Sequence, residues 1–418
     1  FYVPLILGSI IFNYGINRIL IFPQSKHTDF RRIFLALGIL GNLALLGYFK
    51  YTDFLIENWN WAFHAKIEPL NFILPLAISF FTFQQIAYLV DSYKGAVKET
   101  NLFDYALFVL FFPQLIAGPI VHHLEMMPQL NEPINRRINP KNVVSGLLVF
   151  SIGLFKKVVI ADTFAIWASR GFDATEIITL LQAWVTSLSF TLQLYFDFSG
   201  YTDMALGSAL VFNIRLPENF NSPYKALNIR DFWRRWHMSL SRFLLDYIYI
   251  PLGGNRSGLL RTCINLITTF FLCGLWHGAG WTFIFWGLLN GIALIVHHFW
   301  LKTEFKMHYF FSGALTFLFV NFAWVFFRAD EWKNAVQILT AMLGFNGVGA
   351  FELLPALYIL FFLGIVFGAK NSMQWARQVN TKTEAIYIAL FLAFFSLLQL
   401  NNFQISNNKT MEFLYFNF

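Results

Sequence analysis

A histidine in an apolar stretch is the first residue whose type could support chemistry. Residues 271–286, FLCGLWHGAGWTFIFW, contain no acidic or basic side chain apart from His277. An ionisable group inside a membrane helix is costly and usually marks a site or a pathway. Gly274, Gly278 and Gly280 would let backbone or substrate approach closely. We therefore favour a neutral imidazole that acts as general base toward an attacking hydroxyl, over a structural histidine bonded to a backbone carbonyl.

A second histidine lies among basic residues in FWRRWHMSLSRF. His237 is flanked by Arg234, Arg235 and Arg242. Arginine binds phosphate through several directed hydrogen bonds, so these residues could hold an anionic, phosphate-bearing donor. The alternative is an interfacial histidine among arginines whose stems lie along apolar surface. The residues alone leave both interpretations open.

Two carboxylates lie in another apolar stretch, LYFDFSGYTDMALG. Asp197 and Asp203 are six positions apart, which places them on roughly opposite faces of a helix, so they are no obvious catalytic pair. Either could orient a histidine or pair with an arginine, and structural ion pairing is the favoured role. The candidate substrate- or donor-binding residues are therefore Arg234, Arg235, Arg242, Asp197, Asp203 and Trp276, which precedes His277.

The motifs of several other chemistries are missing. The sequence contains no HExxH, CxxC, GxSxG, GxxxxGK(S/T) or GxGxxG. The adjacent His122 and His123 would point in different directions on a helix and lack the spacing of a metal site. We expect no metal and no tightly bound cofactor.

The elements that must position these residues are membrane helices. The chain of 418 residues is 57% hydrophobic, 19% aromatic and 13% charged, a composition typical of an integral membrane protein. Apolar stretches predict about eleven spans, at residues 1–22, 33–55, 74–90, 105–121, 143–168, 177–210, 263–276, 281–300, 310–327, 353–367 and 385–398. The fourth contains Pro113, Gly118 and Pro119, which predict a broken helix. The chain begins at Phe1 inside an apolar run, which suggests a missing N-terminal part.

One polar segment interrupts this pattern. Residues 215–261 are rich in arginine, proline and glycine, and the positive-inside rule places them on the cytoplasmic side. Trp233, Trp236, Leu240 and Phe243 recur near helical spacing, which predicts a helix lying at or just below the membrane surface. The net charge of +7 therefore fits basic cytoplasmic loops, and we expect no nucleic-acid partner.

Taken together, these motifs resemble the membrane-bound O-acyltransferases. The resemblance rests on FFTFQQIAYLVDSYKG, FFPQLIAGPI, LQLYFDFSGYTDMALG, GLWHGAGWTFIFWGLLNG, NFAWVFFRA and the long block of residues 216–256. It implies one polytopic domain over residues 1–418, with a ring of membrane helices around a tunnel. It also implies that His277, in GLWHG, is catalytic, and that His237, in RRWHMSLS, is the cytoplasmic-side motif histidine. Many relatives have arginine after GPIV, where this chain has His122.

Within the family, the resemblance is greatest to the branch that O-acetylates alginate. It implies that acetyl passes from a cytoplasmic donor, acetyl-CoA, across the bacterial inner membrane. A periplasmic or membrane-anchored SGNH-type acetyltransferase would then modify a polysaccharide. Relatives serve other exopolysaccharides or peptidoglycan, and the D-alanyl exporter of teichoic acid synthesis shares the fold and both histidines. YIPLGGNR, at residues 249–256, favours the alginate-like branch over that exporter.

Two further functions stay open at this point. The same fold could transfer long-chain acyl groups or D-alanine. A non-enzymatic transporter could use the histidines as pore-lining or proton-relay groups. The lack of an internal repeat and the scarcity of acidic residues in the apolar stretches count against a transporter.

Overall fold

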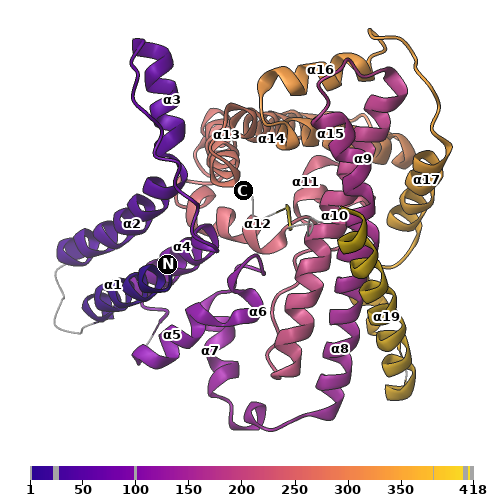
Figure 1. The fold of residues 1–418 in the computed structure, drawn as a ribbon. Helices are drawn as coiled ribbons and strands as arrows, with labels where there is room; N and C mark the ends of the chain where they lie inside the picture. The colour runs from indigo at the N-terminus through magenta and orange to yellow at the C-terminus, as the bar shows by residue number, and fades with distance from the viewer. Residues whose placement is uncertain (1, 22–27, 98–100, 380, 408–412, 415–418) are drawn as a thin grey trace. The chain divides into compact units, whose positions relative to one another are not determined.

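The chain folds into helices. The computed structural model describes residues 2–21, 28–97, 101–379, 381–407 and 413–414 (Figure 1). Every regular element within these ranges is an α-, 3-10 or π-helix, which confirms the all-α prediction. The chain divides into two compact units, of which the first comprises residues 1–140 and 209–217 and the second residues 141–208 and 218–418. A single membrane domain over 1–418, with its ring of helices around a tunnel, stays a prediction.

Seven helices in the described part of the chain are long and apolar enough to cross a membrane. They cover residues 3–21, 29–50, 140–172, 258–277, 281–300, 309–328 and 382–402. Each falls on one of the predicted spans. The multi-span membrane character is therefore supported, whereas the predicted number of about eleven is not confirmed.

The other four predicted spans are not among these seven helices. α4 (Ile78–Tyr93) and α17 (Leu353–Gly368) have 16 residues each. The fourth stretch is broken as predicted, into α5 (Leu102–Leu110) and the short α6 (Phe112–Leu115), with Phe111 extended between them. α10 (Leu180–Val211) has 32 residues and carries many buried polar side chains.

Helices of the first unit are joined by buried amides. α1 (Val3–Ile21) and α2 (Thr28–Lys50) meet at Asn13 and Asn42, whose side-chain amides exchange hydrogen bonds of 2.6 and 3.1 Å. Such bonds hold helices together where no water competes for them. The unit also contains α3 (Thr52–Phe63), α7 (His123–Asn131) and η1 (Pro133–Arg136).

The second unit begins with three continuous helical segments. α8 (Pro140–Phe155) leads into a π-helix, η2 (Lys156–Ala161), and then α9 (Asp162–Phe172). α8 packs directly on α10 because both have glycine at the contact. A Cβ on Gly153 would lie 2.5 Å from the carbonyl oxygen of Gly200, closer than real Cβ atoms approach. α19 (Lys382–Asn407) covers the other side of α8 through Ala385 and Ala389 (Figure 1).

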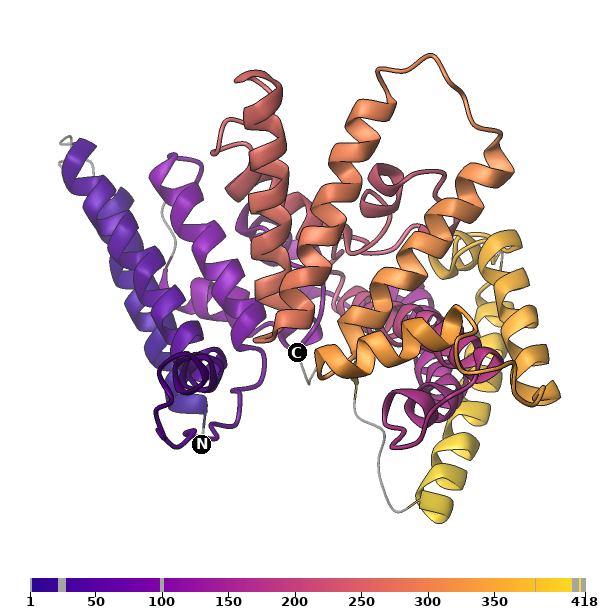
Figure 2. The same ribbon diagram turned by 90° about the horizontal axis from the view of Figure 1, so that it is seen from above.

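A second close contact joins α13 (Gly258–His277) to α14 (Trp281–Trp300), which run side by side in Figure 2. A Cβ on Gly274 would lie 2.3 Å from the carbonyl oxygen of Phe283, and one on Gly287 would lie 2.3 Å from that of Phe270. Glycine thus lets the two backbones touch. The remaining elements are η3 (Pro223–Lys225), α11 (Ile229–Trp233), α12 (Met238–Leu244), the π-helix η4 (Leu245–Tyr249), α15 (Tyr309–Arg328), α16 (Trp332–Met342) and α18 (Ser372–Ala376).

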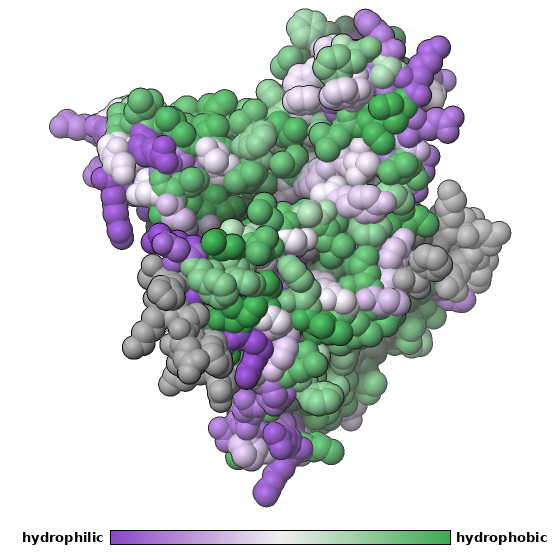
Figure 3. All heavy atoms as spheres, turned by 90° about the vertical axis from the view of Figure 1, so that its left-hand side faces the viewer, coloured by the Kyte–Doolittle hydropathy of each residue, from purple (hydrophilic) through white to green (hydrophobic). Residues whose placement is uncertain are grey.

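Large apolar side chains are exposed along the candidate spans. Leu40 of α2 and Leu390 of α19 are each 62% exposed. Figure 3 shows one face on which hydrophobic residues cover broad areas and hydrophilic residues gather in separate places. A water-soluble protein rarely exposes so much contiguous apolar surface, whereas a helix facing lipid requires it.

The α8–α10 contact predicts the effect of adding one methyl group. Gly153→Ala should lower the free energy of unfolding by about 1–3 kcal/mol, because the helices must separate to admit the Cβ. The midpoint of thermal unfolding in detergent measures this. Gly364→Ala is the matched control, since a Cβ there meets nothing within 4 Å. Equal midpoints for the two variants would show that the close approach at Gly153 is unimportant.

Candidate active site

His237 occupies a sharp turn between two short helices. A single helix through this region was expected, and that prediction is wrong, because α11 ends at Trp233 and α12 begins at Met238. His237 itself has φ 43° and ψ 56°, in the left-handed region. No regular helix continues through such a residue. The spacing of Trp233, Trp236 and Leu240 instead reflects burial, since all three are less than 9% exposed.

The His237 side chain is completely buried, with 0% exposure. Its ring stands edge-on to Phe198 of α10, with centroids 4.7 Å apart and an interplanar angle of 82°. Burial lowers the pKa of the imidazole to about 3. The ring is therefore neutral at neutral pH, the state in which one nitrogen can accept a proton.

His277 is the last residue of α13 and is 3% exposed. Its ring lies between Trp286 of α14, at a centroid distance of 5.2 Å, and Phe327 of α15, at 5.1 Å. The helix stops here because Gly278 is extended, and a Cβ on that glycine would lie 2.2 Å from the ring of Phe283. Gly278 therefore lets the ring of Phe283 approach the backbone next to His277.

Trp276 brings the two histidines into one cluster. Its ring centroid lies 4.9 Å from that of His277 and 6.3 Å from that of His237. The indole is 5% exposed. Residues that come from α13 and from the turn before α12 thus meet around a single aromatic ring, as a shared site would require.

Aromatic side chains form a series of ring contacts that connects the surroundings of the two histidines within the second unit. Phe198 contacts Phe220 at 5.0 Å, Phe220 contacts Trp236 at 5.1 Å, and Trp236 contacts Trp324 at 5.0 Å. Trp324 and Trp286 stack with an interplanar angle of 17°. We call these rings, with Trp276 and Phe327, the aromatic cluster. It surrounds both imidazoles with apolar surface, which strengthens any electrostatic interaction made there.

The three candidate arginines have different environments. Arg235 is held by Asp231 at 2.9 Å and donates to the carbonyl oxygen of Asn221 at 3.3 Å. Arg234 is exposed, and Arg242 is half-buried. Their role in binding a phosphate-bearing donor stays a prediction, and Arg234 is the one most open to an external ligand.

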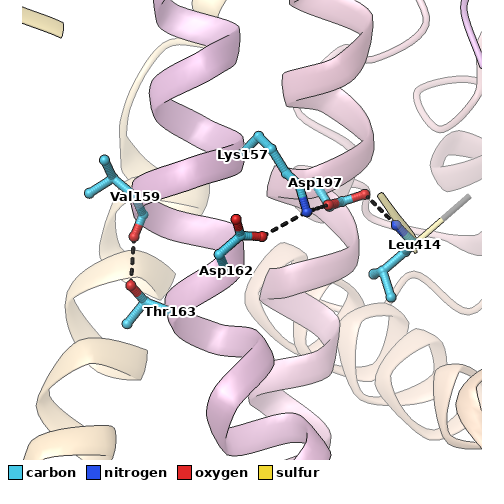
Figure 4. A network of polar contacts seen from close by, with 6 residues as sticks. All are labelled: Lys157, Val159, Asp162, Thr163, Asp197 and Leu414. Carbon is cyan, nitrogen blue, oxygen red and sulfur yellow. Dashed lines mark hydrogen bonds and ion pairs between the residues drawn. The ribbon is translucent and has the colours of Figure 1, made fainter. Parts of the chain in front are cut away.

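The candidate acids pair with lysines that the sequence interpretation missed. Asp203 lies 2.9 Å from Nζ of Lys156, and Asp197 lies 2.7 Å from Nζ of Lys157. Lys157 also contacts Asp162 at 2.7 Å (Figure 4). Ion pairing was the favoured role of these acids, but the expected partners were arginine or histidine. The available signal was two adjacent lysines inside an otherwise apolar span, SIGLFKKVVIADTF.

Residues from far along the chain contact the same charges. The backbone N–H of Leu414 donates to Asp197 at 3.2 Å (Figure 4). The ring of Phe413 lies 4.8 Å from Nζ of Lys157 and edge-on to Tyr201 at 5.0 Å. The lysine therefore has an aromatic face beside its two carboxylates.

A small cavity lined mainly by polar residues lies beside the Lys156–Asp203 pair, and its volume of about 10 Å³ is enough for about one water molecule. Its wall includes Ser199 and Thr202 of α10 and Asn219, which precedes the His237 turn in sequence. Asn219 is a further residue that no motif in the sequence indicated.

Comparison with known proteins identifies relatives. Residues 91–329 match the membrane-bound O-acyltransferase family. A peptidoglycan O-acetyltransferase of Helicobacter pylori is 54% identical over 83% of this chain and 71% of its own length. A probable alginate O-acetylase AlgI of Pseudomonas putida is 37% identical over 100% of this chain and 90% of its own length. A teichoic acid D-alanyltransferase of Bacillus subtilis is 28% identical over 67% of this chain and 76% of its own length.

The buried charges predict a large effect for one substitution. Lys157→Met should lower the free energy of unfolding by about 3–5 kcal/mol, because Asp162 and Asp197 are left buried without their cation. Thermal unfolding in detergent measures the loss, with the exposed Lys370→Met as control. Adding Asp197→Asn to Lys157→Met should recover part of it. An unfolding midpoint unchanged by Lys157→Met alone would contradict the role of this cluster.

Proposed function

The chain belongs to the membrane-bound O-acyltransferase family, and from this premise we propose that it moves an acetyl group from acetyl-CoA in the cytoplasm toward a glycan outside the bacterial inner membrane. The observation that carries the proposal is the meeting of His237 and His277 at Trp276. In a family of O-acyltransferases, two buried imidazoles in one aromatic cluster form a candidate acyl-transfer centre. Sites of this kind combine an apolar lining with a few polar groups.

The proposed chemistry uses His277 as general base. It takes the proton of an acceptor hydroxyl as that oxygen attacks the thioester carbonyl carbon. A C–O bond forms, the C–S bond breaks, and the sulfur of CoA leaves as a thiol after accepting a proton from the imidazolium. The aromatic cluster would keep water away, which limits hydrolysis of the thioester. His237, which is neutral in its buried turn, would lie on the side of the same centre that faces the donor.

The donor would be recognised by charge. CoA carries phosphates, and guanidinium groups bind phosphate through paired hydrogen bonds. Arg234 is exposed and lies three positions before His237, so it is the first candidate for this contact. Arg235, in the same turn, and Arg242, in α12, would assist. Asp197 and Asp203 of α10 would act by holding Lys157 and Lys156, and through these lysines they would hold η2 against α10.

The acceptor is proposed as a cell-surface glycan. The two O-acetylating relatives are named for peptidoglycan and for alginate, and the chain is 54% identical to the first and 37% to the second. Peptidoglycan is therefore the acceptor to test first, ahead of the alginate-like polysaccharide favoured by YIPLGGNR. An SGNH-type acetyltransferase, periplasmic or membrane-anchored, would take the acetyl group to that glycan.

The decisive experiment uses inverted membrane vesicles and radiolabelled acetyl-CoA. We expect His277→Ala to lower transfer of label into the lumen, or onto a partner protein, by at least about 100-fold, because a positioned general base contributes that much. His298→Ala, in the next helix of the chain, is the matched control. Equal labelling by wild type and His277→Ala would contradict the assigned base.

Donor and acceptor are separated by a second comparison. Vesicles carrying the wild-type protein should accept label from acetyl-CoA and not from a long-chain acyl-CoA. Addition of the SGNH-type partner should direct the label to peptidoglycan. Labelling of alginate alone would overturn the choice of acceptor, and labelling from the long-chain donor alone would overturn the choice of acyl group.

A further inference from the structure

His237 adopts a backbone conformation that its surroundings must enforce. Its φ of 43° and ψ of 56° lie in the left-handed region, which is unfavourable for a residue with a Cβ. Such conformations persist only where neighbouring groups fix them, and they are concentrated at functional sites. The direction in which the imidazole points therefore depends on whatever fixes this turn.

The segment 219–221 contacts the turn on both sides of His237. Before the histidine, the N–H of Asn221 donates to the carbonyl oxygen of Arg235 at 2.9 Å. After it, the N–H of Met238 donates to the carbonyl oxygen of Asn219 at 3.0 Å. These two backbone bonds fix the chain two positions before and one position after the left-handed residue.

Asn219 adds a third bond that only its side chain can make. The N–H of Ser239 donates to Oδ1 of Asn219 at 3.1 Å. Ser239 is the second residue of α12, and its N–H is one that helical bonds leave unpaired. A side chain at the N-cap normally accepts from this position, but His237 holds the N-cap and makes no such bond. Asn219 supplies the missing cap from 20 positions earlier in the chain.

The amide of Asn219 is well suited to hold a fixed position. The residue is 0% exposed, so water does not compete freely for Ser239. It also lines the polar cavity beside Lys156 and Asp203. It thereby links the wall of that cavity to the turn that carries the histidine.

We propose that Asn219 is a positioning residue for acyl transfer, which sets the orientation of His237 by capping α12 through space. The proposal rests on the proposed function, because it assigns an effect to Asn219 only through His237. Removing the cap frees the start of α12 and lets the imidazole turn away from Trp276. A displacement of about 1 Å at a reacting group can reduce a rate about 100-fold.

The first test compares initial rates of acetyl transfer in the vesicle assay at several acetyl-CoA concentrations. Asn219→Ala should lower kcat about 100-fold and change KM less than about twofold, since orientation is lost and donor binding is not. Asn219→Asp keeps an oxygen for Ser239 and should stay within about tenfold of wild type. Asn321→Ala is the control, because Asn321 is also buried in this unit and its Oδ1 accepts one hydrogen bond, from Thr191 at 2.7 Å.

Stability is measured on the same variants. The two alanine variants should keep unfolding midpoints close to each other, so that loss of kcat in Asn219→Ala alone reports orientation. Should Asn219→Ala prove unfolded, Asn219→Ser takes its place, because the serine side chain leaves a smaller gap than alanine does but is too short to reach Ser239. A folded Asn219→Ala or Asn219→Ser protein with wild-type kcat would overturn the proposal.

A double-mutant cycle separates this inference from the proposed function. If Asn219 acts through His237, adding Asn219→Ala to His237→Ala should lower the rate less than about twofold further. If the rate loss of the double variant instead equals the product of the two single losses, the positioning role is overturned, while the acyltransferase assignment stays intact. Wild-type activity of His237→Ala would instead remove His237 from the mechanism, and the proposal about Asn219 with it.

Discussion

The fold of the second unit depends on charges that are buried with their partners already in place. Lys157 lies between Asp162 and Asp197 with both distances at 2.7 Å, and Lys156 lies 2.9 Å from Asp203. Taking such groups out of water costs several kcal/mol for each ion, and only good geometry offsets that cost. The register of η2 against α10 is thereby restricted. A slip of either helix would leave a carboxylate or an ammonium group unpaired.

The candidate site is built on helices that are held in place by the buried ion pairs or by close packing at glycine. α10 is held by the ion pairs, and it supplies Phe198 to the ring of His237. α13 and α14 are held by their glycine contact, and they supply His277 and Trp286 to the same aromatic cluster. The imidazoles therefore belong to surfaces that are fixed by other interactions, which is the condition for a preorganised site.

Much of this architecture could be predicted from the sequence, but few of the contacts between its elements could. Runs of apolar residues located the spans, because membrane helices have a strong local signature, and Pro113 located the break between α5 and α6. The near-helical spacing of Trp233, Trp236 and Leu240 led to the wrong prediction of a single helix. Buried side chains can show that spacing even when they do not belong to one helix. Spacing also failed for Lys156 and Lys157, since their partners come from another helix. Asn219 was invisible for the same reason, because a cap supplied 20 positions away leaves no local pattern.

The π-helix from Lys156 to Ala161 explains how two adjacent lysines can both form ion pairs with acids of one neighbouring helix, α10. In an α-helix, consecutive side chains diverge by about 100°, so one of two neighbours normally turns away. Bonding from i to i+5 widens the turn and reduces that divergence. The segment thus carries one residue more than a regular helix of the same length would need. α9, which begins at Asp162, is therefore rotated about its axis relative to α8, so this single extra residue sets the face that α9 presents to its neighbours.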